Sequence, residues 1–80
     1  MPRYYFNTQD GVEFTDREGT ELPDRYAAQT EAARHLADML QERPDELWRH
    51  PTWRLTVTDE RGLTLFEIDV NATLAPVLRG

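Results

Sequence analysis

The sequence predicts an α+β fold in which an antiparallel sheet of about four strands carries one long helix on one face. Three observations favour this fold. Apolar and polar side chains alternate near both ends of the chain, apolar residues recur at three- and four-residue steps in its middle, and a glycine-containing turn interrupts each alternating stretch. The expected order is hairpin, helix, hairpin (β-β-α-β-β), in a single domain over residues 1–80.

We expect the first hairpin over residues 1–15. The aromatic run Tyr4-Tyr5-Phe6 is typical of a β-strand. The pair Asp10-Gly11 tolerates the positive φ angles of a two-residue type I′ turn, so residues 12–15 should return antiparallel beside the first strand.

The helix is expected over residues 24–43. Asp24 is a suitable N-cap, because its carboxylate can accept hydrogen bonds from the free amides of the first turn and favours the positive end of the helix dipole. Pro44 ends the helix and opens a short second turn over residues 45–48. The residues expected on the buried stripe are Ala28, Ala32, Ala33, Leu36, Met39 and Leu40.

The second hairpin is expected over residues 52–70. Its first strand alternates Trp53, Leu55 and Val57 with polar residues. The sequence Asp59-Glu60-Arg61-Gly62 is typical of a type I turn followed by a left-handed glycine. The returning strand is marked by three alternating apolar residues, Phe66, Ile68 and Val70.

Residues 71–80 form a C-terminal tail that two interpretations fit. It carries Leu74, Val77 and Leu78, which favours packing as an edge segment, but also Pro76, which favours a loose extension.

Composition excludes several functions. The chain has 15 acidic and 9 basic residues, for a net charge of −6, and this field repels phosphate backbones, so we expect no nucleic-acid partner. No apolar run approaches the roughly 18 to 20 residues of a membrane span, and the start Met1-Pro2-Arg3 is not typical of a signal peptide, so we expect no membrane association and a cytoplasmic location.

No pattern predicts a catalytic, cofactor or metal site, and we expect no enzyme. The chain has no serine or cysteine, and its two histidines, His35 and His50, have no partner at a recognisable spacing. The acidic residues between positions 16 and 24 do not have the spacing of a calcium-binding loop. The glycines are isolated, which argues against a phosphate-binding loop.

The same composition points to self-association. We expect a chain of 80 residues to be marginally stable, although a monomer could just bury enough apolar surface to fold; without cysteine or a metal site, self-association is the remaining candidate for additional stability. Both faces of the predicted sheet carry apolar side chains, and an exposed apolar face often pairs with another surface. We therefore expect a homo-oligomer, a dimer before larger forms, through the open sheet face or an edge strand. The interface candidates are Tyr5, Trp48, Leu63 and Leu65.

The sequence also resembles a known family. The string Pro2-Arg3-Tyr4-Tyr5-Phe6, the Asp10-Gly11 pair, the acidic turn 16–19 and the string Glu21-Leu22-Pro23-Asp24 ahead of an alanine-rich helix are similar to a small bacterial domain of unknown function, common in soil and plant-associated proteobacteria. This resemblance implies a compact bacterial domain and supplies no catalytic residue. The architecture is more loosely similar to HicB-type antitoxins, although the chain lacks the length and basic charge of their DNA-binding segment.

Two functions follow as hypotheses. The first is a non-enzymatic protein that acts by self-association or by binding another protein. The alternative is an acidic, antitoxin-like or nucleic-acid-mimicking inhibitor, whose carboxylates occupy the basic site of a protein partner. An enzyme would need a pocket that gathers residues such as Tyr26, His35 and Asp38.

Overall fold

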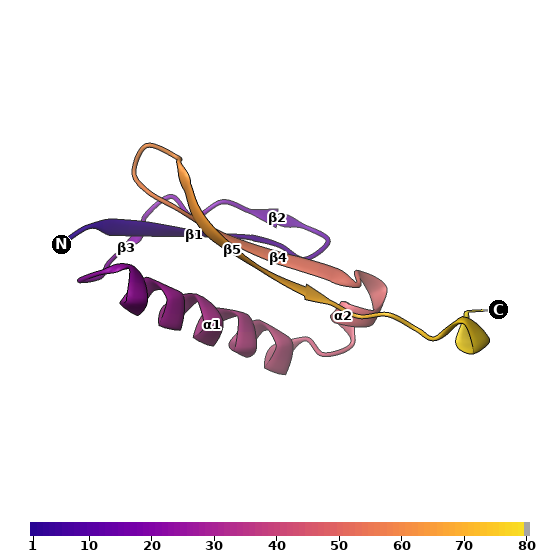
Figure 1. Ribbon diagram of the computed structural model, residues 1–80. Coiled ribbons are helices and arrows are strands. Elements are labelled where there is room, and N and C mark those ends of the chain that lie inside the picture. The colour runs from indigo at the N-terminus through magenta and orange to yellow at the C-terminus, as the bar shows by residue number, and fades with distance from the viewer. Residues whose placement is uncertain (80) are drawn as a thin grey trace.

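Two antiparallel hairpins meet at the centre of the sheet, and one long helix covers one of its faces (Figure 1). The computed structural model describes residues 1–79. The strand order is β2-β1-β4-β5, β3 is a further partner of β1, and the pairings are antiparallel. The predicted α+β class is confirmed. The strands are β1 (Arg3–Gln9), β2 (Glu13–Phe14), β3 (Thr20–Glu21), β4 (Thr52–Thr58) and β5 (Thr64–Asn71).

The long helix α1 spans Arg25–Glu42, within one residue of the prediction at each end. The Asp24 carboxylate caps it by accepting a hydrogen bond from the Ala27 amide at 2.9 Å. At its other end the Arg43 amide donates to the Met39 carbonyl at 3.0 Å, and Pro44 prevents continuation. A short helix follows, α2 (Glu46–Arg49). Within residues 1–79, no helix has the length and apolarity that crossing a membrane requires.

The core lies between α1 and the inward face of β1 and β4. Trp53, Leu55 and Val57 are fully buried on β4, and the sheet alternation places Tyr4 and Phe6 of β1 beside them. The helix contributes the predicted buried residues Ala28, Ala32, Leu36 and Met39. The small alanines allow the helix backbone to approach the sheet closely.

Ala33 does not belong to this buried stripe, contrary to the prediction. Its side chain is exposed, whereas that of Ala32 is fully buried. Successive residues of an α-helix are rotated by about 100°, so Ala33 falls on the flank of the helix rather than against the sheet. Leu40 is only half-buried for a similar reason.

The first hairpin differs from the prediction in its turn. Gln9 pairs with Glu13, which leaves a three-residue loop instead of a two-residue type I′ turn. Gly11 has a φ of 96°, but no non-glycine residue within 1–79 has a positive φ, so Asp10 cannot occupy the first central position of a type I′ turn. β2 is also shorter than expected. Both differences follow from a tertiary contact, since the Asp10 side chain points into the protein and is buried instead of standing in an exposed turn.

The second hairpin agrees with its prediction. Gly62 has a φ of 83°, in the left-handed region that glycine favours. The Asp59 carboxylate closes the turn by accepting hydrogen bonds from the amides of Arg61 at 2.8 Å and Leu63 at 3.0 Å. A register shift between Val57 and Thr58 opens the ladder next to this turn.

The C-terminal segment, residues 72–79, leaves the sheet beyond the end of β5 (yellow in Figure 1). The Ala72 amide donates to the Pro51 carbonyl at 2.8 Å, and the backbone hydrogen bonds that follow are internal to the 3-10 turn Pro76–Leu78. Leu74, Val77 and Leu78 are all exposed, Val77 to 85%. Of the two interpretations of the tail, the structure shows the extension.

Candidate interaction surfaces

Two short strands and one side chain cover the outer edge of β1. β3 pairs with its start, where Tyr4 lies opposite Thr20, and β2 pairs with its end, where Thr8 lies opposite Phe14. Between them, the Phe6 amide donates to the Asp16 carboxylate at 3.2 Å. This edge therefore offers little free backbone to another strand.

Asp16 replaces a strand partner in the gap between β2 and β3. Its carboxylate accepts hydrogen bonds from Phe6, from Glu18 at 3.1 Å and from Gly19 at 3.0 Å, and its own amide donates to the Asn7 side chain at 2.9 Å. Partial burial acts to raise the pKa of Asp16, but the amides of Gly19, Phe6 and Glu18, with a contribution from His35, together lower the pKa below its ordinary value. The ionised form is therefore the one that holds the loop.

A second tie holds the same side of the molecule. The buried Asp10 carboxylate forms an ion pair with Arg43, and the Arg43 guanidinium lies over the Trp53 ring, 5.3 Å from its centre. This contact joins the first hairpin loop, the end of α1 and the start of β4. The sequence did not predict this contact, because Asp10 is 33 positions from Arg43 and the local pattern already explained each residue, Asp10 as part of a hairpin turn and Arg43 as the end of the helix.

The edge of β5 has no such cover within residues 1–79. β5 is eight residues long and pairs only with β4. Ala72 and Pro51 are opposite each other in the register and are joined by a hydrogen bond, so every second residue counted back from Ala72 also bonds to β4. The amides and carbonyls of the residues between them point away from β4. We call these outward groups the β5 edge. They belong to Leu65, Glu67, Asp69 and Asn71.

An apolar row accompanies this edge on the helix side of the sheet. It consists of Phe66, Ile68 and Val70, which pack against the core but remain half-buried. The matching row on β4 is fully buried, because α1 lies over β4 and β1. The apolar row is therefore covered by the helix only along its inner side.

The open face of the sheet is more polar than the sequence predicted. At its centre, Arg54 donates to the Asp69 carboxylate at 2.8 Å and 3.3 Å, and the Arg54 Nε lies 3.7 Å from Glu67 Oε2. The hydrogen bond from Arg54 lowers the pKa of Asp69. The apolar side chains on this face are Tyr5 of β1 and Leu65 of β5. They are separated by β4, on which Thr58 is the register partner of Tyr5. Where the sequence predicted an exposed face with apolar groups, the structure has a cluster of charged side chains with one tyrosine and one leucine at one end.

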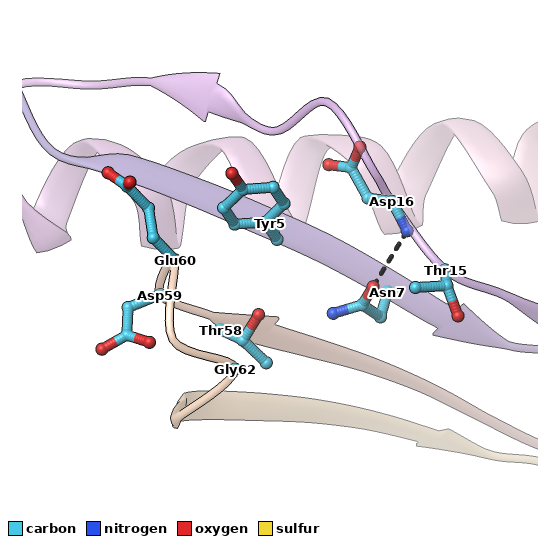
Figure 2. A pocket seen from close by; sticks show the side chains of 8 residues that line it. All are labelled: Tyr5, Asn7, Thr15, Asp16, Thr58, Asp59, Glu60 and Gly62. Carbon is cyan, nitrogen blue, oxygen red and sulfur yellow. Dashed lines mark hydrogen bonds between the residues drawn. The ribbon is translucent and has the colours of Figure 1, made fainter.

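A shallow hollow of about 360 Å³ lies at that end of the open face (Figure 2). Three acidic side chains contribute to its lining, and no basic one does. Figure 2 shows them on either side of Tyr5, Asp16 from the loop before β3 and Asp59 and Glu60 from the turn after β4. The full lining is Tyr5, Asn7, Thr15, Asp16, Thr58, Asp59, Glu60 and Gly62.

Two of the three carboxylates in this hollow already accept hydrogen bonds from the backbone of their own turns. The carboxylates of Asp16 and Asp59 are both engaged by backbone amides, which leaves Glu60 as its exposed carboxylate. Within the described part of the chain, no group of three histidine or acidic side chains could hold a metal ion. The arrangement supports recognition of a positively charged group better than it supports a reaction.

The four predicted interface residues do not form one patch. Trp48, on α2, is 60% exposed and precedes the start of β4, whereas Leu63 lies in the turn that follows its end. Leu65 is exposed on the open face, and Tyr5 is half-buried near Gly19, which approaches its ring closely. The apolar row was missed as a surface because its alternation is equally typical of a core strand.

The boundaries of the fold agree with those of a known family. The family model of a domain of unknown function, DUF6894, matches residues 3–71. The chain belongs to this family. The DUF6894 match begins at the first residue of β1 and ends at the last residue of β5, so it contains the whole sheet and both α-helices. Residues 72–79, the C-terminal segment, lie outside it.

DUF6894 membership confirms the predicted resemblance to a domain of unknown function. The particular residue pattern and the likeness to HicB-type antitoxins remain predictions. Comparisons with curated proteins and with solved structures gave no match.

Proposed function

We propose that this protein acts by homotypic association through the β5 edge and has no catalytic step of its own. The observation that supports this proposal is the contrast between a long unpaired strand edge and a closed edge on the other side of the same sheet. Unpaired edges recruit further strands, and proteins usually protect them with proline, lysine, shortness or an inward charge. β5 has eight residues and contains no proline, and both of its charged residues, Glu67 and Asp69, are paired with Arg54 of β4.

The side chains of β5 favour a two-fold antiparallel pairing. With Ile68 on the axis, each Ile68 faces its copy, and Phe66 faces the partner's Val70. These positions do not form hydrogen bonds across the new pairing, and side chains approach most closely at such positions. The two apolar rows would then cover each other where α1 leaves them half-exposed.

Charge opposes this pairing on the open face. The same register sets Glu67 opposite the partner's Asp69, and like charges across a strand pair are destabilising. Arg54 of each chain offsets part of this repulsion through its contacts with both carboxylates. The association should therefore strengthen when salt screens the charges, over a Debye length of about 8 to 10 Å.

The test is the solution mass of the protein by light scattering coupled to size exclusion, across a dilution series at low and moderate salt. We expect a species of twice the 9.4 kDa protomer, more populated at moderate salt. A protein that is monomeric at every concentration and salt level overturns the proposal.

A matched pair of variants at Glu67 locates the interface. Glu67→Pro removes an outward amide without touching the ladder to β4, because the Glu67 backbone groups point away from β4. Glu67→Ala removes the same carboxylate and keeps the amide. We expect Glu67→Pro to be a folded monomer by circular dichroism and Glu67→Ala to dimerise at least as well as the parent. Equal dimerisation of the two variants would place the interface elsewhere.

A second function is favoured by the hollow of Figure 2. Its three carboxylates support binding of a basic protein partner, as an acidic or nucleic-acid-mimicking inhibitor would do, with Arg3 and Arg61 beside Asp59 and Glu60 in the adjoining hollow. Glu60 carries this function, since Asp16 and Asp59 are engaged by amides.

Titration with an arginine-rich peptide tests this second function. Binding should weaken with salt, in contrast to the edge association, and Glu60→Arg should abolish it. Glu42→Arg, a change of the same charge on the far end of α1, is the control and should bind normally. Equal loss in the two variants would show that only net charge matters.

A further inference from the structure

We infer that residues 72–79 of each copy cross over in the dimer and pack against the partner near the start of its β5 and α1. This inference rests on the proposed pairing of the β5 edges. The segment supplies apolar side chains, since Leu74, Val77 and Leu78 are exposed, and the described part of its own chain gives them no buried seat. It also lies outside the family match, which covers residues 3–71.

The two-fold pairing determines where the segment goes. With Ile68 on the axis, Asn71 faces the partner's Leu65, and the segment then continues past the partner's Leu63. With at most about 3.5 Å for each residue outside the 3-10 turn Pro76–Leu78 and about 2 Å for each residue within it, residues 72–79 span at most about 23 Å. The segment therefore reaches the partner's second hairpin turn and the region beside it.

The first turn of α1 lies at that same end of the molecule. α1 follows β3, which pairs with the start of β1, and the Arg43 to Asp10 ion pair holds the end of α1 near the end of β1. The helix therefore runs parallel to β1, and because β4 is antiparallel to both β1 and β5, it also runs parallel to β5 (Figure 1).

Tyr26 is the exposed aromatic at this position. Glu31 and His35 line a hollow with Phe14, which shows that their flank of α1 faces β2. Tyr26 lies about 140° to 180° from those two residues around the helix axis, so its flank faces β5. Tyr26 and Leu63 are each 64% exposed and Phe66 is half-buried, which gives the incoming segment three apolar contacts.

Charge is compatible with this seat. Residues 72–79 contain one charged residue, Arg79, and no acidic one. The partner's hairpin turn contributes Asp59 and Glu60 beside Arg61, Arg25 lies 4.8 Å from the centre of the Tyr26 ring, and the protein as a whole carries a net charge of −6. The net negative charge of the partner therefore attracts Arg79, whereas it would repel an acidic residue at this position.

Cysteine cross-linking tests the inference, because the chain contains no cysteine of its own. Leu78→Cys and Tyr26→Cys are made in separate full-length chains and mixed, so that a short bismaleimide can join the two positions only between molecules. We expect a cross-linked heterodimer. The control mixes Leu78→Cys with Trp48→Cys, an equally exposed position at the opposite end of β4, and should give little product.

The outcomes separate this inference from the function on which it rests. If the mixed variants are dimeric by light scattering but positions 78 and 26 do not cross-link in excess of the control, the crossed segment is wrong and the edge pairing stands. If the protein is monomeric throughout, both are wrong. As a second measurement, Val77→Asp should raise the dimer dissociation constant at least about tenfold, as expected for loss of one interface anchor. An unchanged constant would contradict the seat.

Discussion

The two edges of this sheet are treated in opposite ways. On the β1 side, β3, the Asp16 carboxylate and β2 together pair the outward backbone of Tyr4, Phe6 and Thr8. On the β5 side, an edge of similar length pairs with no strand in the described chain. The difference teaches that a short domain can close one edge of its sheet with two short strands and one side chain, and the association proposed above uses the edge that remains.

The largest effect is expected from breaking the tie on the closed side. Arg43→Ala leaves the buried Asp10 carboxylate without its cation, and removing one partner of a buried ion pair costs several kcal/mol. Because Arg43 is itself partly exposed, we expect a loss of about 2 to 4 kcal/mol in the free energy of unfolding. Urea denaturation measures this loss. Arg34→Ala, which removes a surface pair with Glu31, is the control and should change stability by less than about 0.5 kcal/mol.

A somewhat smaller effect is expected at Asp16. Asp16→Ala leaves the Phe6 amide and two loop amides without their acceptor, for an expected loss of about 2 to 3 kcal/mol. Hydrogen exchange should show faster exchange of the Phe6 amide. Unchanged exchange at Phe6 would mean that the loop does not close this edge in solution.

Acid should act through the same residue. The pKa of Asp16 is lowered in the folded protein, so its contribution to stability is present above the pKa of the unfolded chain and is lost as the pH falls through the folded pKa. We therefore expect stability to fall below about pH 4, where aspartates of the unfolded chain begin to bind protons. The Asp16→Ala variant should lose less stability than the parent over this range.

The smallest effect compares the turns of the two hairpins. Gly11→Ala and Gly62→Ala both force a side chain into positive φ, which costs about 1 kcal/mol. A Cβ at position 11 would also lie 2.5 Å from the His50 ring, whereas nothing lies within 4 Å of one at position 62. We expect losses of about 2 and about 1 kcal/mol, respectively, because His50 must move only in the first variant. Equal losses would show that the loop around Asp10 is looser than the structure indicates.

Much of the fold can be predicted from short stretches of the sequence. The Asp24 cap, the helix stripe from Ala28 to Met39 and the Gly62 turn depend on neighbours within a few positions, so periodicity and residue type are enough to predict them. The error in the first hairpin has a different cause, the contact of a turn residue with a residue far along the chain. Asp10 has the local pattern of a type I′ turn, but its burial against Arg43 gives a three-residue loop instead.

The sequence by itself determined the fold class, the helix and the core face of β4, because hydrophobic periodicity specifies which side of each element is buried. Only the tertiary structure decided which strands lie at the edges, how Asp16 completes one of them and that the open face is a charged ladder. Strand order and edge cover depend on contacts between residues far apart in the chain, and a local pattern carries no record of them. The same alternation that buries Leu55 on β4 leaves Ile68 half-exposed on β5, because one strand is central and the other is not.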